Sequence, residues 1–541
     1  MSMTWLADVE PETAWAHHAW TEFGKSQLGP RTLAILPLFG FAEHGLGLPL
    51  DAEEILGSAV LRAAAVAAKS AGTLRVLPPL RFGVAPYPSG FFGIDAETLR
   101  DLILEIADGV KRAGCAKLAF FITSPWNVEI IDTISRDVRE VHGLETFYLP
   151  LAGLGLNFQP ASEDRAKTQA AIAKILGQPT SPVSRDSEQR DPDFRPGHFA
   201  WPGPLPRGGA PVDGAAAANA AAAKLAQALV EIFQWPDQLA AGARASAGKI
   251  GFFPNSASPI SAKPKVTSSV ALEGDAAAAF VAEARIYPDG FRRRYLPSLT
   301  LDELEKIPDK NAAWVIIPMA AIEQHGPHLP VGVDAHLGHA WVSQTLALFP
   351  AGAPIYVAPA ITFGKSNEHV GFSGTVSVSG NTLRRLLLAI ATQLQALGFR
   401  QIAVLSSHGG NTAMVLHTLR EIQTTLGLRA GLLGQPYKPD VSAQEAEMGF
   451  HAGEWETSLM LAIASDLVRM DRAVCEFPAQ REELGLLRLD HGVANVSWMT
   501  ADISRSGVMG DATAATVEKG ERWLRAGAEA LAKKLLDLEK S

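Results

Sequence analysis

Cysteine is nearly absent from this chain: its 541 residues include only Cys115 and Cys475, which lie in different halves. A framework of disulfide bonds is therefore excluded, and we expect a reducing, cytoplasmic setting. The sequence contains no run of eighteen apolar residues, so we expect no membrane-spanning helix. The first residues lack the basic and apolar stretches of a secretory signal, and we expect none.

Basic residues are outnumbered by acidic ones, 48 Lys and Arg against 57 Asp and Glu. The net charge is −9, and the longest block of basic residues is the triplet Arg292-Arg293-Arg294. We expect that triplet to be a solvated turn, because short charge runs usually are. Nucleic acid and anionic membranes are therefore excluded as expected partners. With 47% hydrophobic and 19% charged residues, the chain is typical of a globular protein, and its length predicts two large domains or three small ones.

Two regions of the chain follow the same order of short apolar runs, loops and helical patterns. The first half has predicted strands at 32–37 and 117–124 around a predicted helix at 96–115; the second has strands at 312–318 and 401–407 around helices at 337–348 and 381–399. Such alternation is typical of a parallel sheet with helices on both faces. We therefore predict an α/β protein made by tandem duplication, with domains at 1–235 and 291–541 and a connecting segment at 236–290.

Acidic and imidazole side chains collect where the predicted strands of the second half end. Glu323 and His325 are two positions apart in extended chain, so they point the same way. Asp334 follows through a loop bounded by prolines, and His408 ends the strand at 401–407. Ligands of parallel sheets gather at the carboxyl ends of strands. Two carboxylates and two imidazoles suit Zn²⁺, Mn²⁺ or Fe²⁺, and Asp334 could bridge two ions.

A third segment, HAGEWETS at 451–458, precedes an apolar run and predicts a helix that begins near Gly453. His451 and Glu456 could serve there as acid/base groups, and Glu456 also as a further metal ligand. The pattern fits equally well with acidic residues that cap a helix. Trp455, in the same segment, is a candidate for contacting substrate.

The segment after His408 is rich in glycine. Gly409 and Gly410 allow backbone N–H groups to approach a ligand closely, and together with Asn411 they could stabilise an oxyanion. The same pattern is also typical of an ordinary tight turn before a helix. His328 and His369 lie near these motifs; each is a candidate for contacting substrate, with a structural role as the alternative.

Taken together, these segments resemble the creatininase (creatinine amidohydrolase) family. The resemblance rests on EQHGPHLPVGVD after Pro318, then SHGGNTA, HAGEWETS and SGVMGDATAATVEKG, and it covers about 250 residues. It implies an αβα sandwich, often assembled as a hexamer, with a pair of divalent metal ions. It also implies that Glu323, His325, Asp334 and His408 are metal ligands, that Asp334 bridges, and that His451 is the catalytic histidine.

One departure from the family concerns the second ion. Creatinine hydrolases have Tyr-Glu immediately after the histidine that corresponds to His408, whereas this chain has Gly409-Gly410. A second ion would then take Glu456 instead, or be held weakly. The Gly-Gly form resembles relatives that deformylate a pyrimidine nucleotide or trim a modified peptide, so creatinine is not the expected substrate. We expect one or two ions, with zinc first and manganese or iron as alternatives.

The first copy of the motif is degenerate. Aligned on the second copy, it has Ala42 opposite Glu323 and Ser124 opposite His408, while His44 stays opposite His325. The acidic ligand survives only as Asp51 or Glu53. We therefore expect the first half to be metal-free.

These observations predict a metal-dependent amidohydrolase. We expect it to cleave a C–N bond of a small-molecule substrate, namely a cyclic amide, lactam, imide or formamide, by metal-activated water. The alternatives are a metal-dependent peptidase acting on a short modified peptide, and a non-catalytic binding or scaffold protein. We also expect a homo-oligomer, a trimer of two-domain chains that imitates a hexamer, in which the first copy acts as a scaffold.

Overall fold

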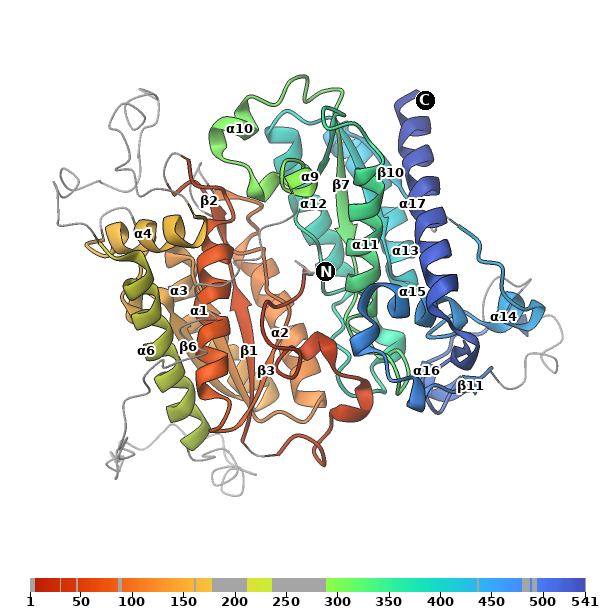
Figure 1. Cartoon of the computed structure of the whole chain (residues 1–541), viewed down its shortest axis with the longest axis horizontal. Coiled ribbons are helices and arrows are strands. Elements are labelled where there is room, and N and C mark those ends of the chain that lie inside the picture. Colours follow the sequence, from red (N-terminus) through yellow and green to blue (C-terminus); the bar gives the residue numbers. More distant parts are fainter. Residues whose placement is uncertain are drawn as a thin grey trace.

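The computed structural model of this chain describes residues 5–29, 31–44, 47–85, 90–159, 162–177, 212–235, 289–434, 437–478, 487–488 and 494–540. In Figure 1 the first half, coloured red to yellow, lies beside the second half, coloured green to blue. The segment at 236–290 that we predicted to connect the halves lies outside the described residues up to position 288.

The first half is built on a four-stranded sheet in which every neighbouring pair is parallel. Its strands, in spatial order, are β3 (Thr73–Val76), β1 (Thr32–Leu38), β5 (Lys117–Ile122) and β6 (Glu145–Pro150). All side chains of β1 and β5 are buried, as expected for the central strands of a sheet covered on both faces.

The second half repeats this sheet. Its strands, also parallel throughout, are β10 (Arg429–Leu432), β9 (Gln401–Ser406), β7 (Trp314–Met319) and β8 (Ile355–Val357). In order along the chain, each strand takes the place of its counterpart in the first half: β7 corresponds to β1, β8 to β3, β9 to β5 and β10 to β6.

Isolated β-bridges also recur in both halves, in addition to the strand pairs of the two main sheets. The isolated bridge Ala14↔Val76 has its counterpart in Tyr295↔Val357, and Leu38↔Leu80 in Met319↔Ile361. The short antiparallel pair β2 (Phe41–Ala42) and β4 (Gly90–Phe91) corresponds to the bridge Ile322↔Val376. Repetition at this level supports the predicted duplication.

Helices cover both faces of the first sheet. Leu33 and Ile35 of β1 pack with α1 (Ala52–Ala68), α4 (Arg165–Ile175) and α6 (Gly214–Gln234). The alternate residues Ala34 and Leu36 pack with α2 (Ala96–Arg112) and α3 (Val128–His142). Side chains that alternate along a strand point to opposite faces, so this half is an αβα sandwich.

The second sheet is covered in the same way. Trp314 and Ile316 pack with α11 (Val333–Ala347), α15 (Glu454–Ala464) and α17 (Val517–Lys540). Val315 and Ile317 pack with α12 (Gly380–Ala396) and α13 (Thr412–Leu426). The predicted fold class, two αβα sandwiches with mainly parallel sheets, is confirmed.

The remaining elements are short. They are helices α9 (Asp289–Arg292), α10 (Leu301–Glu305), α14 (Ala443–Met448) and α16 (Thr500–Ile503), strands β11 (Cys475–Glu476), β12 (Leu487–Arg488), β13 (Ala494–Asn495) and β14 (Gly510–Asp511), and the 3-10 helices η1 (Trp15–His17), η2 (Trp20–Glu22), η3 (Pro125–Asn127), η4 (Leu151–Leu154), η5 (Leu296–Ser298), η6 (Asn367–His369), η7 (Gly409–Asn411), η8 (Ser465–Leu467), η9 (Met470–Arg472) and η10 (Ala512–Ala514). No helix among the described residues is long and apolar enough to cross a membrane.

The basic triplet is not simply a solvated turn. Arg294 is buried, and its guanidinium donates to the carbonyl oxygen of Pro350. That expectation was therefore wrong for Arg294, because a loop carbonyl provides the acceptor that a buried guanidinium needs.

The two halves pack closely against each other. One continuous apolar cluster contains residues of α2 and α3 together with residues of α12 and α13. At its edge, Arg385 Nη2 of α12 lies 2.5 Å from Asp101 Oδ2 of α2. Trp5, at the start of the chain, packs in the core of the second half, with its ring 5.4 Å from that of His339. The second half therefore folds around side chains of the first.

Candidate metal centre

Polar side chains of the second half meet where β7 and β9 end. Glu323, Gln324 and His325 lie in the loop after β7, Asp334 is the second residue of α11, and His408 directly follows Ser407 after β9. All five side chains are buried, and His408, at 6% exposed, is the most accessible. The structure thus brings together the four residues that the sequence singled out.

Three of these residues form a compact group that could hold a cation. Ligand atoms of Glu323, Asp334 and His408 all lie within 4.8 Å of one another. His408 Nδ1 is 3.1 Å from Glu323 Oε2 and 3.6 Å from Asp334 Oδ2. A side-chain set of two oxygens and one nitrogen suits zinc, manganese or iron.

A second group shares Asp334 with the first. It consists of His325, Asp334 and Glu456, again with ligand atoms within 4.8 Å. His325 Nε2 is 3.7 Å from Asp334 Oδ1 and 3.9 Å from Glu456 Oε2. Two groups joined by one carboxylate have the arrangement that a bridged pair of ions requires. Glu456, the third residue of α15, thus stands where the sequence predicted a replacement ligand.

The hydrogen bonding of the two groups is incomplete in a way that fits a metal. His325 Nε2 and Asp334 Oδ2 are buried and have no hydrogen-bond partner. Buried polar atoms without partners are costly. Divalent cations held by the two groups would satisfy both atoms.

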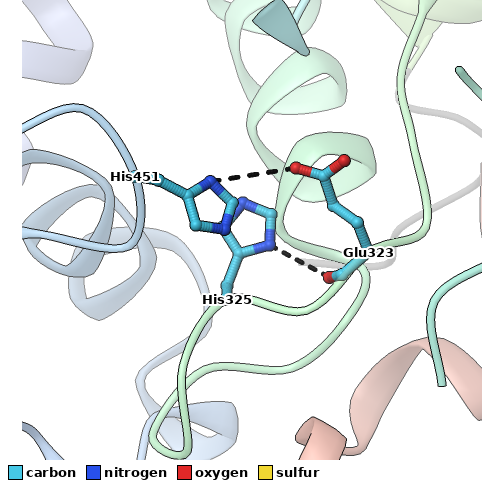
Figure 2. Close-up of side chains that lie close together, drawn as sticks. All are labelled: Glu323, His325 and His451. Atoms are coloured by element: carbon cyan, nitrogen blue, oxygen red, sulfur yellow. Dashed lines mark hydrogen bonds and ion pairs between the residues drawn. The ribbon is translucent and has the colours of Figure 1, made fainter. Parts of the chain in front are cut away.

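His451 forms a third group of possible ligands with Glu323 and His325, and Figure 2 shows its ring beside that of His325 and turned toward the Glu323 carboxylate. Its Nδ1 is 3.8 Å from Glu323 Oε1, and its ring centroid is 4.3 Å from that of His325. Its Nε2 is 2.7 Å from the carbonyl oxygen of Gln324, to which it can donate a proton. That bond leaves Nδ1 as the nitrogen turned toward Glu323. Ala452, the next residue, adopts a positive φ of 53°, a conformation that L residues rarely take and that clusters at functional sites.

The pKa values of these groups are strongly shifted. Burial, and then the neighbouring His451, lowers the pKa of His325 well below its usual value, which favours the neutral ring that a metal ion binds. Burial and the nearby Glu323 raise the pKa of Asp334 well above its usual value. Burial alone would lower the pKa of His408, but the Glu323 carboxylate outweighs it and raises that pKa. Perturbed groups that converge in this way are typical of functional sites.

The candidates for substrate contact lie at different places around the centre. His369 Nε2 is 3.4 Å from Glu323 Oε1, and its ring stacks on His451 at 4.2 Å. His328 Nε2 is 2.8 Å from Thr457 Oγ1, and burial lowers the pKa of His328 to about 4. Trp455 packs against Trp341 of α11, with ring centroids 5.7 Å apart. Of these three, only His369 touches the metal-binding groups.

The glycine-rich segment after His408 forms η7 directly before α13, which agrees with the tight turn that was one of its two interpretations. A Cβ on Gly410 would lie 2.3 Å from Glu368 Oε1 and 2.4 Å from His408 Nε2, so only glycine fits there. The Asn411 side chain accepts from the amide of Lys365 at 2.9 Å and donates to the carbonyl of Ala320 at 3.1 Å. Asn411 therefore holds two loops together, and the structure gives it no contact with the centre.

Three further residues belong to the centre and were not predicted. Glu368 Oε1 is 3.5 Å from His408 Nε2, Ser366 donates to Glu323, and the Gln324 side-chain nitrogen is 3.1 Å from His451 Nε2 and 3.0 Å from His369 Nδ1. Glu368 directly precedes His369, which the sequence indicated as a candidate for contacting substrate. That adjacency was the one sequence feature that pointed to it.

The equivalent place in the first half is closed by hydrogen bonds. Glu53, the second residue of α1, occupies the position of Asp334. Its carboxylate is 2.9 Å from His44 Nε2, and it accepts from Ser124 at 2.5 Å, Thr123 at 2.8 Å and the Gly40 amide at 2.8 Å. Burial would raise the pKa of Glu53, but the hydrogen bonds led by His44 hold it below its usual value.

Asp51, the other acidic candidate in the first half, has a different role. Its Oδ2 accepts from Ser298 of the second half at 2.7 Å. Burial raises the pKa of Asp51 to about 7. Among the described residues, every group that could hold a metal lies in the second half.

The family model described as creatinine amidohydrolase matches residues 16–184 and 297–535. Each matched segment falls in one half of the chain and contains one of the two four-stranded sheets. The match thus agrees with the repeated topology.

Individual relatives match the chain over a single domain length. A mycofactocin precursor peptide peptidase of Mycolicibacterium smegmatis is 35% identical over 210 residues, which are 38% of this chain and 78% of the relative. A creatinine amidohydrolase of Pseudomonas putida is 29% identical over 254 residues, 42% of this chain and 90% of the relative. A crystal structure of creatinine amidohydrolase is 24% identical with a TM-score of 0.39, and covers 45% of this chain and 97% of its own.

Proposed function

This chain belongs to the creatininase family of hydrolases, and on that premise we propose that its second half is a metal-dependent amidohydrolase and its first half a metal-free scaffold. We propose the domain limits 1–235 and 291–541 for the two halves. Glu323, His325, Asp334, His408 and Glu456 are the proposed ligands.

One observation supports this proposal above all others. Two of the three groups that could hold a metal, Glu323/Asp334/His408 and His325/Asp334/Glu456, share a buried carboxylate whose Oδ2 has no hydrogen-bond partner. A protein that only bound a partner would have no reason to keep these costly groups together, because each unsatisfied buried polar atom destabilises the fold. The arrangement favours an enzyme over a non-catalytic binding or scaffold protein.

The proposed cofactor is one or two divalent ions, zinc first, with manganese or iron as alternatives. When bound, the metal would supply an activated water and polarise the substrate carbonyl. Glu323 and Asp334 would hold it through oxygen, and His325 and His408 through nitrogen. Glu456 would provide the ligand for a second ion that Gly409-Gly410 cannot.

His451 is the proposed acid/base group. Because its Nε2 bonds to the Gln324 carbonyl, its Nδ1 is free to hold a proton on the side of the centre. From there it can pass the proton to the leaving nitrogen when the C–N bond breaks. His369, stacked on His451 and close to Glu323, is positioned to orient the substrate. We propose Gly409 and Gly410 as backbone donors to the substrate oxygen.

The proposed substrates are small cyclic amides, lactams, imides or formamides. A second candidate, the hydrolysis of a short modified peptide, is favoured by a specific observation: the 35% identical relative from Mycolicibacterium smegmatis is a precursor peptide peptidase. Both reactions break an amide C–N bond, so one centre could serve either. They differ in the space that each requires beside the scissile bond.

Assembly and location also remain proposals. We propose a trimer of two-domain chains that presents six sandwiches, located in the cytoplasm. The mass of the protein in solution tests the assembly: three times the mass of one chain supports it, and a single chain contradicts it.

A substrate screen tests the proposed reaction. The purified chain, loaded separately with Zn²⁺ and Mn²⁺, would be assayed against lactams, imides, formamides and short peptides. Turnover that is lost on chelation and restored by metal supports the amidohydrolase, and the class of substrate decides between the two candidates. A protein that binds metal but hydrolyses no amide of any of these classes would contradict the proposal.

A further inference from the structure

Equivalent segments of the two halves make reciprocal hydrogen bonds to the opposite half. The carbonyls of Ala16 and His18 in the first half accept from the amides of Gly332 and Val331, at 3.0 and 2.9 Å. In return, the carbonyls of Pro297 and Leu299 accept from the amides of Asp51 and Leu50, at 2.8 and 3.0 Å. Each half thus holds the loop that precedes the first long helix of the other, and in the second half that loop leads to Asp334.

These two segments have different side chains at matched positions. The paired hydrogen bonds fix the register, which places Trp15 opposite Leu296 and Trp20 opposite Leu301. The register continues into the next turn, where Ala19 N bonds to Glu22 and Thr300 N bonds to Glu303. The segment that reaches the candidate metal centre therefore has two indole N–H donors, and the segment that reaches the closed site has two leucines. Leucine side chains have no donor.

Trp15 is connected to Gln324 of the centre through the turn at Gly374. Its Nε1 donates to the carbonyl of Gly374 at 3.0 Å. Gly374 has a φ of +87°, and a Cβ there would lie 2.5 Å from the ring of Phe23, so the first half fixes this turn on two sides. The next residue, Thr375, accepts the backbone N–H of Gln324 at 3.0 Å.

Trp20 reaches the same residue by another route. Its Nε1 donates to the carbonyl of Ser506 at 3.0 Å, and its ring meets that of Phe372 edge-on at 5.0 Å. The next residue, Gly507, accepts from the Gln324 side-chain amide at 3.0 Å, and a Cβ on Gly507 would collide with that amide. Both indoles thus hold loops that hydrogen-bond to Gln324. This residue lies between Glu323 and His325 in the chain and contacts His451.

We propose that the first half completes the active site of the second: Trp15 and Trp20 are positioning residues that hold Gln324, and through it Glu323, His325 and His451, in register for metal binding and turnover. This inference rests on the proposed function for its kinetic consequence, but not for its consequence on metal binding. The degenerate first half would then contribute to catalysis by positioning residues of the second half, although its own hydrogen-bonded site at Glu53 is proposed to be metal-free.

The test removes the two indole donors and keeps the aromatic rings. The full chain with Trp15→Phe and Trp20→Phe is compared with Ser298→Ala, which breaks the Ser298–Asp51 hydrogen bond between the halves on the side of the closed site. The Zn²⁺ affinity of the metal-stripped protein is measured by competition with a chelating dye, Tm by thermal unfolding, and kcat and KM on the best substrate of the screen. The single variant Trp20→Phe, at a half-buried position, serves if the double variant fails to fold.

We expect the double phenylalanine variant to bind Zn²⁺ about tenfold to a hundredfold more weakly, the range found when groups behind metal ligands are removed. We expect kcat of the double variant to fall by a similar factor, with a smaller change in KM. We expect Ser298→Ala to keep the Zn²⁺ affinity and kcat of the unaltered chain, with a Tm comparable to that of the double variant. Unchanged Zn²⁺ affinity and kcat in the tryptophan variants would overturn the proposal, as would an equal loss in Ser298→Ala. If the unaltered chain hydrolyses no amide, the proposed function fails, and the Zn²⁺ affinities still decide this inference.

Discussion

The two halves of this chain have a buried acidic residue at the same position of the same fold, but its hydrogen bonding and the direction of its pKa shift are opposite. In the second half, Asp334 has an oxygen without a hydrogen-bond partner and a pKa raised by burial and by Glu323. In the first, Glu53 accepts from His44, Ser124, Thr123 and Gly40, and its pKa is lowered. The Asp334 carboxylate thus lacks hydrogen bonds that a bound cation would replace, whereas donors of the protein itself satisfy the Glu53 carboxylate.

Two substitutions account for most of this difference. Ala42 stands where the second half has Glu323, so no second carboxylate repels Glu53. Ser124 stands where the second half has His408, and a hydroxyl donates directly to Glu53 at 2.5 Å. Where the second half has a candidate metal centre, the first half thus has a hydrogen-bonded core.

The largest expected effect comes from making the second half resemble the first. His408→Ser should remove the metal and reduce kcat/KM by more than about a hundredfold, because loss of a ligand exceeds the tenfold to hundredfold cost of losing a group behind one. Metal analysis and steady-state kinetics would check this. Ser124→Ala, at the equivalent position of the first half, is the control and should leave activity unchanged. Full activity in His408→Ser would contradict the proposal that His408 is a metal ligand.

A smaller effect is expected at the second metal-binding group. Glu456→Ala removes the carboxylate 3.9 Å from His325 Nε2 and leaves Glu323, Asp334 and His408 intact. We expect the protein to keep one ion and lose the other, with kcat lower by about tenfold to a hundredfold. Zinc titration of the metal-stripped protein measures the number of ions. Two tightly bound ions in the variant would show that Glu456 is not a ligand.

Removing the buried acid should change the stability of the two halves in opposite directions. In metal-stripped protein, Glu53→Ala should lower the free energy of unfolding by about 2–3 kcal/mol, because it leaves buried donors unsatisfied. Asp334→Asn should be neutral or stabilising under the same conditions, because it removes a carboxyl group whose charged form is disfavoured by burial and by Glu323. Since the pKa of Glu53 is lower in the folded state, its contribution is present above its ordinary pKa and is lost as the pH falls. Urea unfolding of both variants at pH 7 and pH 4 tests these signs, and equal losses in the two variants would contradict them.

The smallest expected effect concerns Asp51, where the second half has Gly332. The pKa of Asp51 is raised to about 7 by burial, so the folded state binds its proton more tightly than the unfolded state. Asp51 therefore costs stability as the pH rises from about 4 to about 7. Asp51→Asn should stabilise the protein by about 1–2 kcal/mol at pH 8, since the buried amide offsets part of the gain, and by nothing at pH 4. A gain of the same size at both pH values would show that charge is not the cause.

The sequence predicted those features that depend on local pattern. The strand that ends at Ser406 and the helix that begins at Glu454 were both expected, and parallel strand ends were enough to bring Glu323, Asp334 and His408 together. Glu456 could be placed because it lies in the first turn of that helix.

What the sequence did not predict depends on contacts between distant segments. Asn411 was expected near the substrate, but its amide bonds to backbone groups after β7 and β8, which no local pattern reveals. The link between Trp20 and Ser506 joins the two ends of the chain and is visible only in the packed molecule. Helix α4 packs on α6 and α1 as α15 packs on α17 and α11, yet it contains no trace of the HAGEWETS motif.

The central claim is that one half of a duplicated chain has kept a metal centre that the other has lost. The most direct test is the number of metal ions per chain in the purified protein, in Asp334→Ala and in Glu53→Ala. The account predicts one or two ions in the unaltered chain, the same number in Glu53→Ala, and none in Asp334→Ala. An unaltered chain that binds no divalent metal, or an Asp334→Ala variant that keeps its full complement, would contradict it.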